Sequence, residues 1–187
     1  MTDGAAVYRQ GDPPDGLYAV VEGQVRLTGY SPQGIGFLLL LAGPGEWFGE
    51  ASSLDDGPRQ QDAVSHGNSV VLHISHGDLA KIGAETPGLW RAIGRMASLH
   101  QRAALASIRN LLSMPAAGRV ALLLQALDGR RPGVPLSIAQ DELAANVGLS
   151  RQTVNAVLQD LRRRGLIELG YGSVRVTGDL TGIAQGD

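Results

Sequence analysis

The 187-residue sequence predicts an α+β protein: an N-terminal β-roll of the jelly-roll type, then a long helix, then a C-terminal winged helix-turn-helix. Short apolar or alternating runs, cut by glycine, proline and aspartate, extend from Ala5 to Ile74 and are typical of an all-β roll. Helical periodicity follows, and after it comes a helix-turn-helix pattern closed by two strands. We expect an effector-type roll over residues 1–85, a long dimerisation helix over 86–112 and the winged helix-turn-helix over 113–187.

Composition excludes several classes of protein. The chain has no cysteine, which excludes disulfides, thiolate zinc sites, iron-sulfur clusters and cysteine nucleophiles. No signal segment opens the chain, and its longest strongly apolar run, Phe37–Ala42, is far below the roughly 20 residues that span a bilayer. We therefore expect a cytoplasmic protein with no membrane partner, and we interpret this run as a buried strand.

The charge of the chain is slightly asymmetric. The net charge is −2. Residues 1–114 carry 8 basic and 11 acidic side chains, whereas residues 115–187 carry 8 and 7. The C-terminal part is therefore the better partner for a polyanion, although the difference is small.

Segments rich in glycine and proline separate the runs of the predicted roll. They are Gly11–Gly16, the residues around Gly23, Ser31–Gly34 and Ala42–Glu46. Glycine and proline supply the positive and fixed φ angles that hairpin turns need. We therefore expect short strands joined by tight turns, followed by a short helix over residues 77–83.

A long helix is predicted from Pro87 to about Leu112. Its apolar positions are Leu89, Ile93, Met96, Leu99, Ala103, Leu105, Ile108 and Leu112. A helix of about 25 residues is about 38 Å long, more than a small roll can cover, so part of its apolar face needs another partner. A second copy of the chain is the favoured partner, and packing against its own chain alone is the alternative.

The next helix is predicted to start at Ser113 and to run to Leu127. The serine is a capping residue, and Pro115 suits the first turn of a helix. The glycine- and proline-rich segment Asp128–Pro135 is interpreted as a loop.

The segment that follows has the spacing of a helix-turn-helix. Ser137 and Gln140 have capping-box spacing for a helix over Gln140–Val147, Gly148 allows a sharp turn, and Ser150 caps a second helix. The positions predicted to point inward are Leu143, Ala144, Val147, Leu149, Val154 and Val157. Ala144 must be small, because the second helix crosses closely there.

The outward face of the second helix carries side chains that suit DNA recognition. Arginine bonds bidentately to guanine, and glutamine or asparagine to adenine, so Arg151, Gln152 and Asn155 are the candidate base-reading residues. Ser150 and Thr153 suit phosphate contacts near the helix N-terminus. The simpler interpretation is an amphipathic helical hairpin with solvated polar residues.

A strand pair after the second helix favours DNA binding over that simpler interpretation. The helix ends near Gly165, and "LIEL" and "SVRVT", joined by "GYG", form the wing of a winged helix. The basic run Arg162–Arg164 is interpreted as a partly solvated helix end with incidental attraction to phosphate.

Three stretches carry a resemblance that covers the whole chain. They are "YRQGDPPDGLYAVVEGQVRL" and "GPGEWFGE" in the roll, and "GLSRQTVNAVLQDLRRRGLIEL" near the C-terminal end. In these residues and in their order, the chain resembles the Crp/Fnr family of bacterial transcription regulators. The resemblance implies a cyclic-nucleotide-binding-type roll and a homodimer that binds a near-palindromic operator in double-stranded DNA, which agrees with two recognition helices about one DNA turn apart.

The resemblance also suggests other partners and one departure. RNA polymerase and an unidentified small-molecule effector are candidate partners. The family usually has a further helical segment before the first strand, and we expect this chain to lack most of it.

The effector pocket implied by the resemblance is expected to be altered. In family members that bind cyclic AMP, a Gly-Glu pair meets the ribose, and an Arg-Ser or Arg-Thr pair ten residues after the glutamate holds the cyclic phosphate. Gly49 and Glu50 keep the first pair. Counting from Glu50 places Gln60 and Gln61 at the second pair, with Arg59 one residue early and, in an extended segment, turned to the opposite face. The alternative is a local gap that brings Arg59 into register.

Further substitutions point the same way. Asp62 adds negative charge beside the expected phosphate, and Ala104 and Leu105 stand where the family has a Thr-Ser pair that meets adenine. Losing an arginine–phosphate contact sacrifices about 1.5 to 3 kcal/mol. No cofactor is therefore assigned with certainty, and cyclic AMP in the usual mode is disfavoured. Two interpretations stay open: a pocket for another small molecule, or a roll retained as a dimer scaffold.

Other constellations are weaker. His66, His73 and His76 lie within eleven positions without a thiolate or close acid, so ordinary histidines are favoured over a metal site. Glu46 and Glu50 are better explained as a turn residue and a roll residue than as a catalytic pair. No nucleophile or acid–base constellation is found, so we do not expect an enzyme.

The favoured function is a dimeric, sequence-specific DNA-binding transcription regulator. The alternative is a β-roll regulatory or protein-interaction module whose winged helix does not bind DNA.

Overall fold

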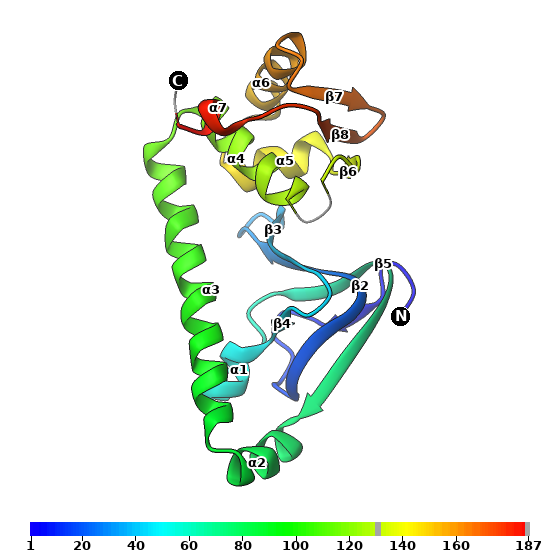
Figure 1. The fold of residues 1–187 in the computed structure, drawn as a ribbon. Helices are drawn as coiled ribbons and strands as arrows, with labels where there is room; N and C mark the ends of the chain where they lie inside the picture. Colours follow the sequence, from blue (N-terminus) through cyan, green and yellow to red (C-terminus); the bar gives the residue numbers. More distant parts are fainter. Residues whose placement is uncertain (130–131, 186–187) are drawn as a thin grey trace. The chain divides into compact units, whose positions relative to one another are not determined.

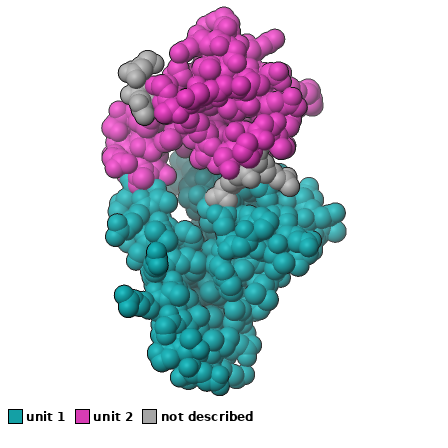
Figure 2. Space-filling model, viewed as in Figure 1, with its two compact units in different colours: residues 1–105 teal, residues 106–187 magenta. Residues whose placement is uncertain are grey.

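The computed structural model describes residues 1–129 and 132–185. The chain divides into two units, residues 1–105 and 106–187 (Figure 2). The long helix α3 (Gly88–Ser113) crosses the division between them.

The first unit is built on one antiparallel sheet (Figure 1). Its strands are β1 (Ala6–Tyr8), β2 (Gly16–Tyr30), β3 (Gly36–Ala42), β4 (Trp47–Phe48) and β5 (Asp62–Ser75). The strand order is β1-β5-β2-β3, and β4 pairs with β2. The predicted antiparallel sheet domain, long helix and C-terminal helix-turn-helix are confirmed.

Strands β2 and β5 are longer than the sequence predicts. The residues around Gly23 do not form a hairpin turn: β2 continues through Gly23, whose φ is 76°, and its register against β5 shifts between Glu22 and Gln24. A glycine with positive φ suits a bulge as well as a turn, which is why the pattern suggested two short strands.

The apolar strand β3 is not buried as expected. Leu39 is 55% exposed, and of the seven residues of β3 only Ala42 is buried. This strand lies at the end of the strand order, where its one neighbouring strand is β2, so within the described residues a second strand does not cover its other edge.

Three helices accompany the sheet in the first unit. The helix α1 (Glu50–Asp55) was not predicted, because it has only six residues and its N-cap, Gly49, offers no capping side chain. The helix α2 (His76–Glu85) is longer than expected, and the Ser75 hydroxyl caps it by accepting from the backbone N–H of Asp78. The helix α3 agrees with its predicted range.

The second unit contains the helix-turn-helix and its wing. Its elements are α4 (Ala116–Asp128), β6 (Leu136–Ser137), α5 (Gln140–Val147), α6 (Arg151–Arg163), β7 (Ile167–Gly170), β8 (Ser173–Val176) and α7 (Thr181–Gln185). The predicted helices and wing strands are present, whereas β6 and α7 were not predicted. The predicted start at Ser113 is wrong, because α3 continues through Ser113 and α4 begins at Ala116 with Pro115 as its N-cap. The predicted capping box is wrong, because Ser137 pairs with Ser173 in the sheet β6-β8-β7 and the N-cap of α5 is Ala139.

Candidate functional site

The second helix of the pair, α6, is fixed by an apolar interior that it shares with α4 and α5. The buried side chains are Val120, Leu124, Leu143, Ala144, Val147, Val154, Leu158 and Leu161. Two positions predicted to point inward, Leu149 and Val157, are partly buried. Because one face of α6 is buried in this way, its opposite face is held rigidly toward solvent.

The turn between α5 and α6 is stabilised by capping contacts. Gly148 has a φ of 61°, the left-handed conformation that glycine adopts most readily. Arg119 Nη1 of α4 donates to the carbonyl oxygen of Val147 at 2.8 Å, a contact that the local pattern did not predict. The Ser150 hydroxyl accepts from the backbone N–H of Thr153 at 3.1 Å, so Ser150 is the predicted N-cap of α6.

The exposed face at the start of α6 carries the predicted base-reading side chains. Arg151, Gln152 and Asn155 are exposed, and Thr153 is partly buried, with its hydroxyl 2.8 Å from that of Ser150. Arg151 Nη1 lies 3.4 Å from Asp141 Oδ2 of α5, and these side chains are 68% and 71% exposed. Such an exposed ion pair contributes little, so Arg151 can leave Asp141 at small cost.

The wing and the basic helix end carry exposed ion pairs, and at the helix end one carboxylate, Asp160, is shared by two of three exposed arginines. Arg175 of β8 lies 3.4 Å from the Glu168 carboxylate of the paired strand β7. Arg163 and Arg164 lie 2.7 and 3.9 Å from the Asp160 carboxylate. This arrangement agrees with a solvated helix end rather than with a strong phosphate site.

In the roll, the predicted register of the second pocket pair is wrong. The structure buries the side chain of Arg59, whereas Gln60 is exposed and Gln61 partly buried. Counting along an extended segment fails because α1 and a coil lie between Glu50 and Arg59. The backbone of Arg59 pairs with the loop before β2, since its N–H donates to Asp12 O and its carbonyl accepts from the N–H of Gly11, both at 2.8 Å.

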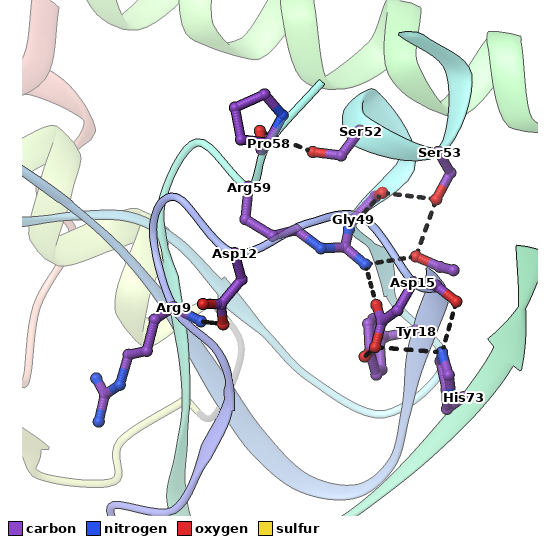
Figure 3. Close-up of polar contacts among 11 residues, drawn as sticks. Arg9, Asp12, Asp15, Tyr18, Gly49, Ser52, Ser53, Pro58, Arg59 and His73 are labelled. Carbon is purple, nitrogen blue, oxygen red and sulfur yellow. Dashed lines mark hydrogen bonds and ion pairs between the residues drawn. The ribbon is translucent and has the colours of Figure 1, made fainter. Parts of the chain in front are cut away.

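The guanidinium of Arg59 has several acceptors around it (Figure 3). Its Nη1 donates to Gly49 O at 2.9 Å, and its Nη2 donates to Gly16 O at 2.7 Å and to Asp15 Oδ1 at 2.6 Å. Its Cζ lies 4.4 Å from the ring centroid of Tyr8 and 5.4 Å from that of Tyr18, within the range of cation–π contacts. The buried arginine is therefore paired, stacked and hydrogen-bonded at once.

Gly49 and Glu50 lie where α1 begins. Gly49 has a φ of 88°, which favours glycine, and a Cβ at this position would lie 2.7 Å from Arg59 Nη1 and would displace the guanidinium. Glu50 is buried, and its Oε1 lies 2.7 Å from His100 Nδ1 of α3. This contact, which the sequence did not indicate, joins α1 to the long helix.

The remaining predicted pocket residues are not among the hydrogen-bond partners of the Arg59 guanidinium given above. Ala104 and Leu105 are exposed on α3. Asp62 is buried and accepts from Arg9 Nη1 at 2.7 Å, from Gln10 N at 2.8 Å and from the Tyr30 hydroxyl at 2.9 Å. Its charge is thus met by Arg9.

The cluster shifts the titration of its members. Burial raises the pKa of Asp15, but hydrogen bonds from Tyr18 and Arg59 and the charge of Arg59 outweigh it, so the pKa lies below its usual 3.8. Burial, together with the hydrogen bond to Asp15, raises the pKa of Tyr18 well above its usual range. Asp15 therefore carries its negative charge at neutral pH, and Tyr18 keeps its proton.

Across residues 1–129 and 132–185, no three His, Asp or Glu side chains are grouped so that they could hold a metal ion. Among the helices of those same residues, none combines the length and apolarity that crossing a bilayer requires.

Comparisons with known proteins agree with this architecture. Residues 1–86 match the family described as cyclic nucleotide-binding domain, and residues 118–178 match the Crp-like helix-turn-helix domain. The chain is 31% identical over 181 residues to the CRP-like cAMP-activated global transcriptional regulator of Mycobacterium tuberculosis, covering 93% of this chain and 81% of that protein. It is 35% identical over 173 residues to the cyclic AMP receptor protein of Thermus thermophilus, covering 92% and 80%.

A solved structure agrees as well. A transcriptional regulator of the CRP/FNR family from Thermus thermophilus superimposes with a TM-score of 0.80 at 28% identity, covering 99% of this chain and 95% of that one. The order of roll, long helix and winged helix-turn-helix is thus shared along nearly the whole chain. The chain belongs to the Crp/Fnr family of DNA-binding transcription regulators.

Proposed function

We propose that the chain acts as a homodimeric, sequence-specific transcription regulator in which the start of α6 reads base edges in the major groove. The observation that carries this proposal is the exposed row of Arg151, Gln152 and Asn155 on a helix whose other face is buried. These side chains have the donors and acceptors that distinguish guanine and adenine. The hydroxyls of Ser150 and Thr153 are placed at the helix N-terminus, where phosphate contacts are favourable.

The apolar face of α3 supports the homodimer. This helix of 26 residues exposes Leu99, Leu105, Ile108 and Leu112, and Leu112 is 84% exposed. Exposed apolar side chains at helical spacing are typical of a helix–helix interface. A two-fold dimer presents two α6 helices to two half-sites about one DNA turn apart, which requires a near-palindromic operator. RNA polymerase is a candidate partner of the bound dimer.

The effector pocket is altered in this proposal, for a different reason from the one that the sequence suggested. The arginine is present, but Asp15 pairs with it, and the carboxylate of Glu50 is bonded to His100. Gln60 is exposed, and it stands immediately after Arg59 where cyclic AMP-binding relatives carry a hydroxyl residue. We expect weak binding of cyclic AMP at most, and calorimetry that gives a micromolar or tighter dissociation constant for the wild-type protein would contradict this.

The function is tested by a gel shift on genomic DNA fragments at several salt concentrations. A sequence-specific regulator retards a small set of fragments, and those complexes persist in the presence of random competitor DNA. Retardation of no fragment at low salt would favour the module whose winged helix does not bind DNA.

A further inference from the structure

A carboxylate of the chain itself holds the buried arginine of the roll. We propose that Asp15 is an internal ligand of Arg59, which occupies the arginine in place of an anionic effector and sets the pocket against phosphate-bearing ligands. The proposal rests on the proposed function, in that it treats the roll as an effector pocket.

Arg59 and Asp15 lie at different depths in the roll. The side chain of Arg59 is 1% exposed, whereas that of Asp15 is 53% exposed, and the two are 2.6 Å apart. Asp15 is therefore the solvent-side partner of the pair. Figure 3 shows Arg59 reaching from the segment after α1 toward Gly49 and Asp15. An anion that approaches the guanidinium from solvent meets a carboxylate that is already there.

Few N–H groups of the Arg59 guanidinium are left to an incoming ligand. Nη2 donates to Gly16 O and to Asp15, and Nη1 donates to Gly49 O. Nε is buried and has no hydrogen-bond partner within residues 1–129 and 132–185. Guanidinium groups bind phosphate most strongly through two N–H groups. Both N–H groups of Nη2 are already used, so a ligand that binds Nε together with Nη2 must displace either the backbone oxygen of Gly16 or the exposed Asp15 carboxylate.

Asp15 is itself fixed in place by its neighbours. The Tyr18 hydroxyl donates to Asp15 Oδ2 at 2.6 Å, and the Tyr18 ring stacks on His73 at a centroid distance of 4.5 Å. His73 Nε2 also lies 3.2 Å from the backbone oxygen of Asp15. Both carboxylate oxygens are therefore directed, one by Arg59 and one by Tyr18. The loop that carries Asp15 also contains two consecutive prolines, Pro13 and Pro14, which restrict its backbone.

The charge of Asp15 then decides which ligands are excluded. A bound phosphate would place a second negative charge beside the ionised carboxylate, and like charges within about 4–6 Å disfavour each other. An uncharged ligand does not meet this repulsion. The internal ion pair thus discriminates by charge.

The test is calorimetric titration of the full chain with cyclic AMP and, separately, with adenosine, which lacks the phosphate. The variant is Asp15→Asn, which keeps the shape of the side chain and removes its charge. We expect Asp15→Asn to bind cyclic AMP at least roughly tenfold more tightly than the wild type, with no change for adenosine. Adding Arg59→Gln to Asp15→Asn should abolish the gain.

The matched control is Asp12→Asn. Asp12 lies in the same loop, but its carboxylate accepts from the backbone N–H of Arg9 and not from Arg59. If Asp15→Asn and the smaller variant Asp15→Ala both bind cyclic AMP no more tightly than Asp12→Asn, the proposal is overturned. A gel shift with the same proteins tests the proposed function separately. If the wild type does not bind DNA, the proposed function fails, whereas the calorimetric comparison of Asp15→Asn with Asp12→Asn still decides the role of Asp15.

Discussion

The two units use arginine in opposite ways. In the roll, Arg59 is buried and bonded to two backbone carbonyls and a carboxylate. In the helix-turn-helix, Arg151 is largely exposed and has one long contact to an equally exposed carboxylate. A guanidinium that is bonded through both Nη atoms inside the protein serves the structure first, whereas one that is held loosely on a rigid helix is available to a partner. Each prediction below tests one side of this comparison.

The largest effect is expected from Arg59→Met. The substitution keeps much of the side-chain volume but removes one donor each from Gly49 O, Gly16 O and Asp15, which keep their hydrogen bonds from the Ser53 and Tyr18 hydroxyls. We expect the free energy of unfolding of the roll to fall by about 2 to 4 kcal/mol, measured by denaturant unfolding of the full chain. The neighbouring exposed residue provides the control: Gln60→Ala should change the free energy by less than about 0.5 kcal/mol. Equal stability of the two variants would restore the register in which Gln60 is the inward residue.

The next largest effect is expected from Arg151→Ala, on DNA rather than on stability. Loss of a bidentate contact to guanine should cost about 1 to 3 kcal/mol at one base position and relax specificity there. Fluorescence anisotropy on the selected operator and on random duplex measures both. Equal loss on the two duplexes would show that Arg151 contacts only phosphate. As a control, Arg163→Ala, at the far end of α6, should change the affinity for both duplexes by the same small factor.

A smaller effect is expected from His100→Ala. The substitution removes the partner of the Glu50 carboxylate, whose side chain is 11% exposed, and so loosens the contact between α1 and α3. We expect a loss of about 1 to 2 kcal/mol in the free energy of unfolding. The adjacent exposed residue on α3 is the comparison, and a Gln101→Ala variant that loses as much would argue against the His100–Glu50 contact.

The smallest and most gradual effect is expected from Asp62 as the pH is lowered. Burial raises the pKa of Asp62, but hydrogen bonds from Gln10, Arg9 and Tyr30 and the charge of Arg9 lower it below the usual 3.8. Because the pKa in the folded state is depressed, this contribution to stability is complete above the unfolded value and is lost as the pH falls through the folded value. The difference in free energy of unfolding between wild type and Asp62→Asn should be constant above about pH 5 and shrink below pH 4.

The non-titrating variant Gln60→Ala is the control for that series. Its difference from the wild type should not change over the same range of pH. A constant difference for Asp62→Asn as well would mean that the Arg9–Asp62 pair adds nothing to the folded state.

The sequence predicted the helix-turn-helix well because its determinants are local. The cap at Ser150, the turn at Gly148 and the alternation of buried and exposed positions in α6 follow from spacings of three to ten residues. The interior of that unit was predicted less completely, since Leu158 and Leu161 are buried beyond the positions that the motif suggested. Arg119, which holds the turn from another helix, has no local signal at all.

The cluster around Arg59 in the roll could not be predicted to the same depth, because its geometry depends on segments distant in sequence. Arg59 is aimed inward by backbone pairing with residues of the loop before β2, and its partners Asp15 and Gly16 lie more than 40 positions away. The count from Glu50 treated the connection as extended, whereas α1 shortens it. A helix of six residues with no side-chain cap gives little pattern to detect.

The central claim is that the exposed face of α6 gives the protein sequence-specific DNA binding as a two-fold dimer. Selection of bound sites from random double-stranded DNA by the full chain tests it most directly. The account predicts enrichment of a near-palindromic site whose half-sites lie about one helical turn apart. Recovery of sequences without a common site, at a salt concentration where DNA is still retained, would contradict it.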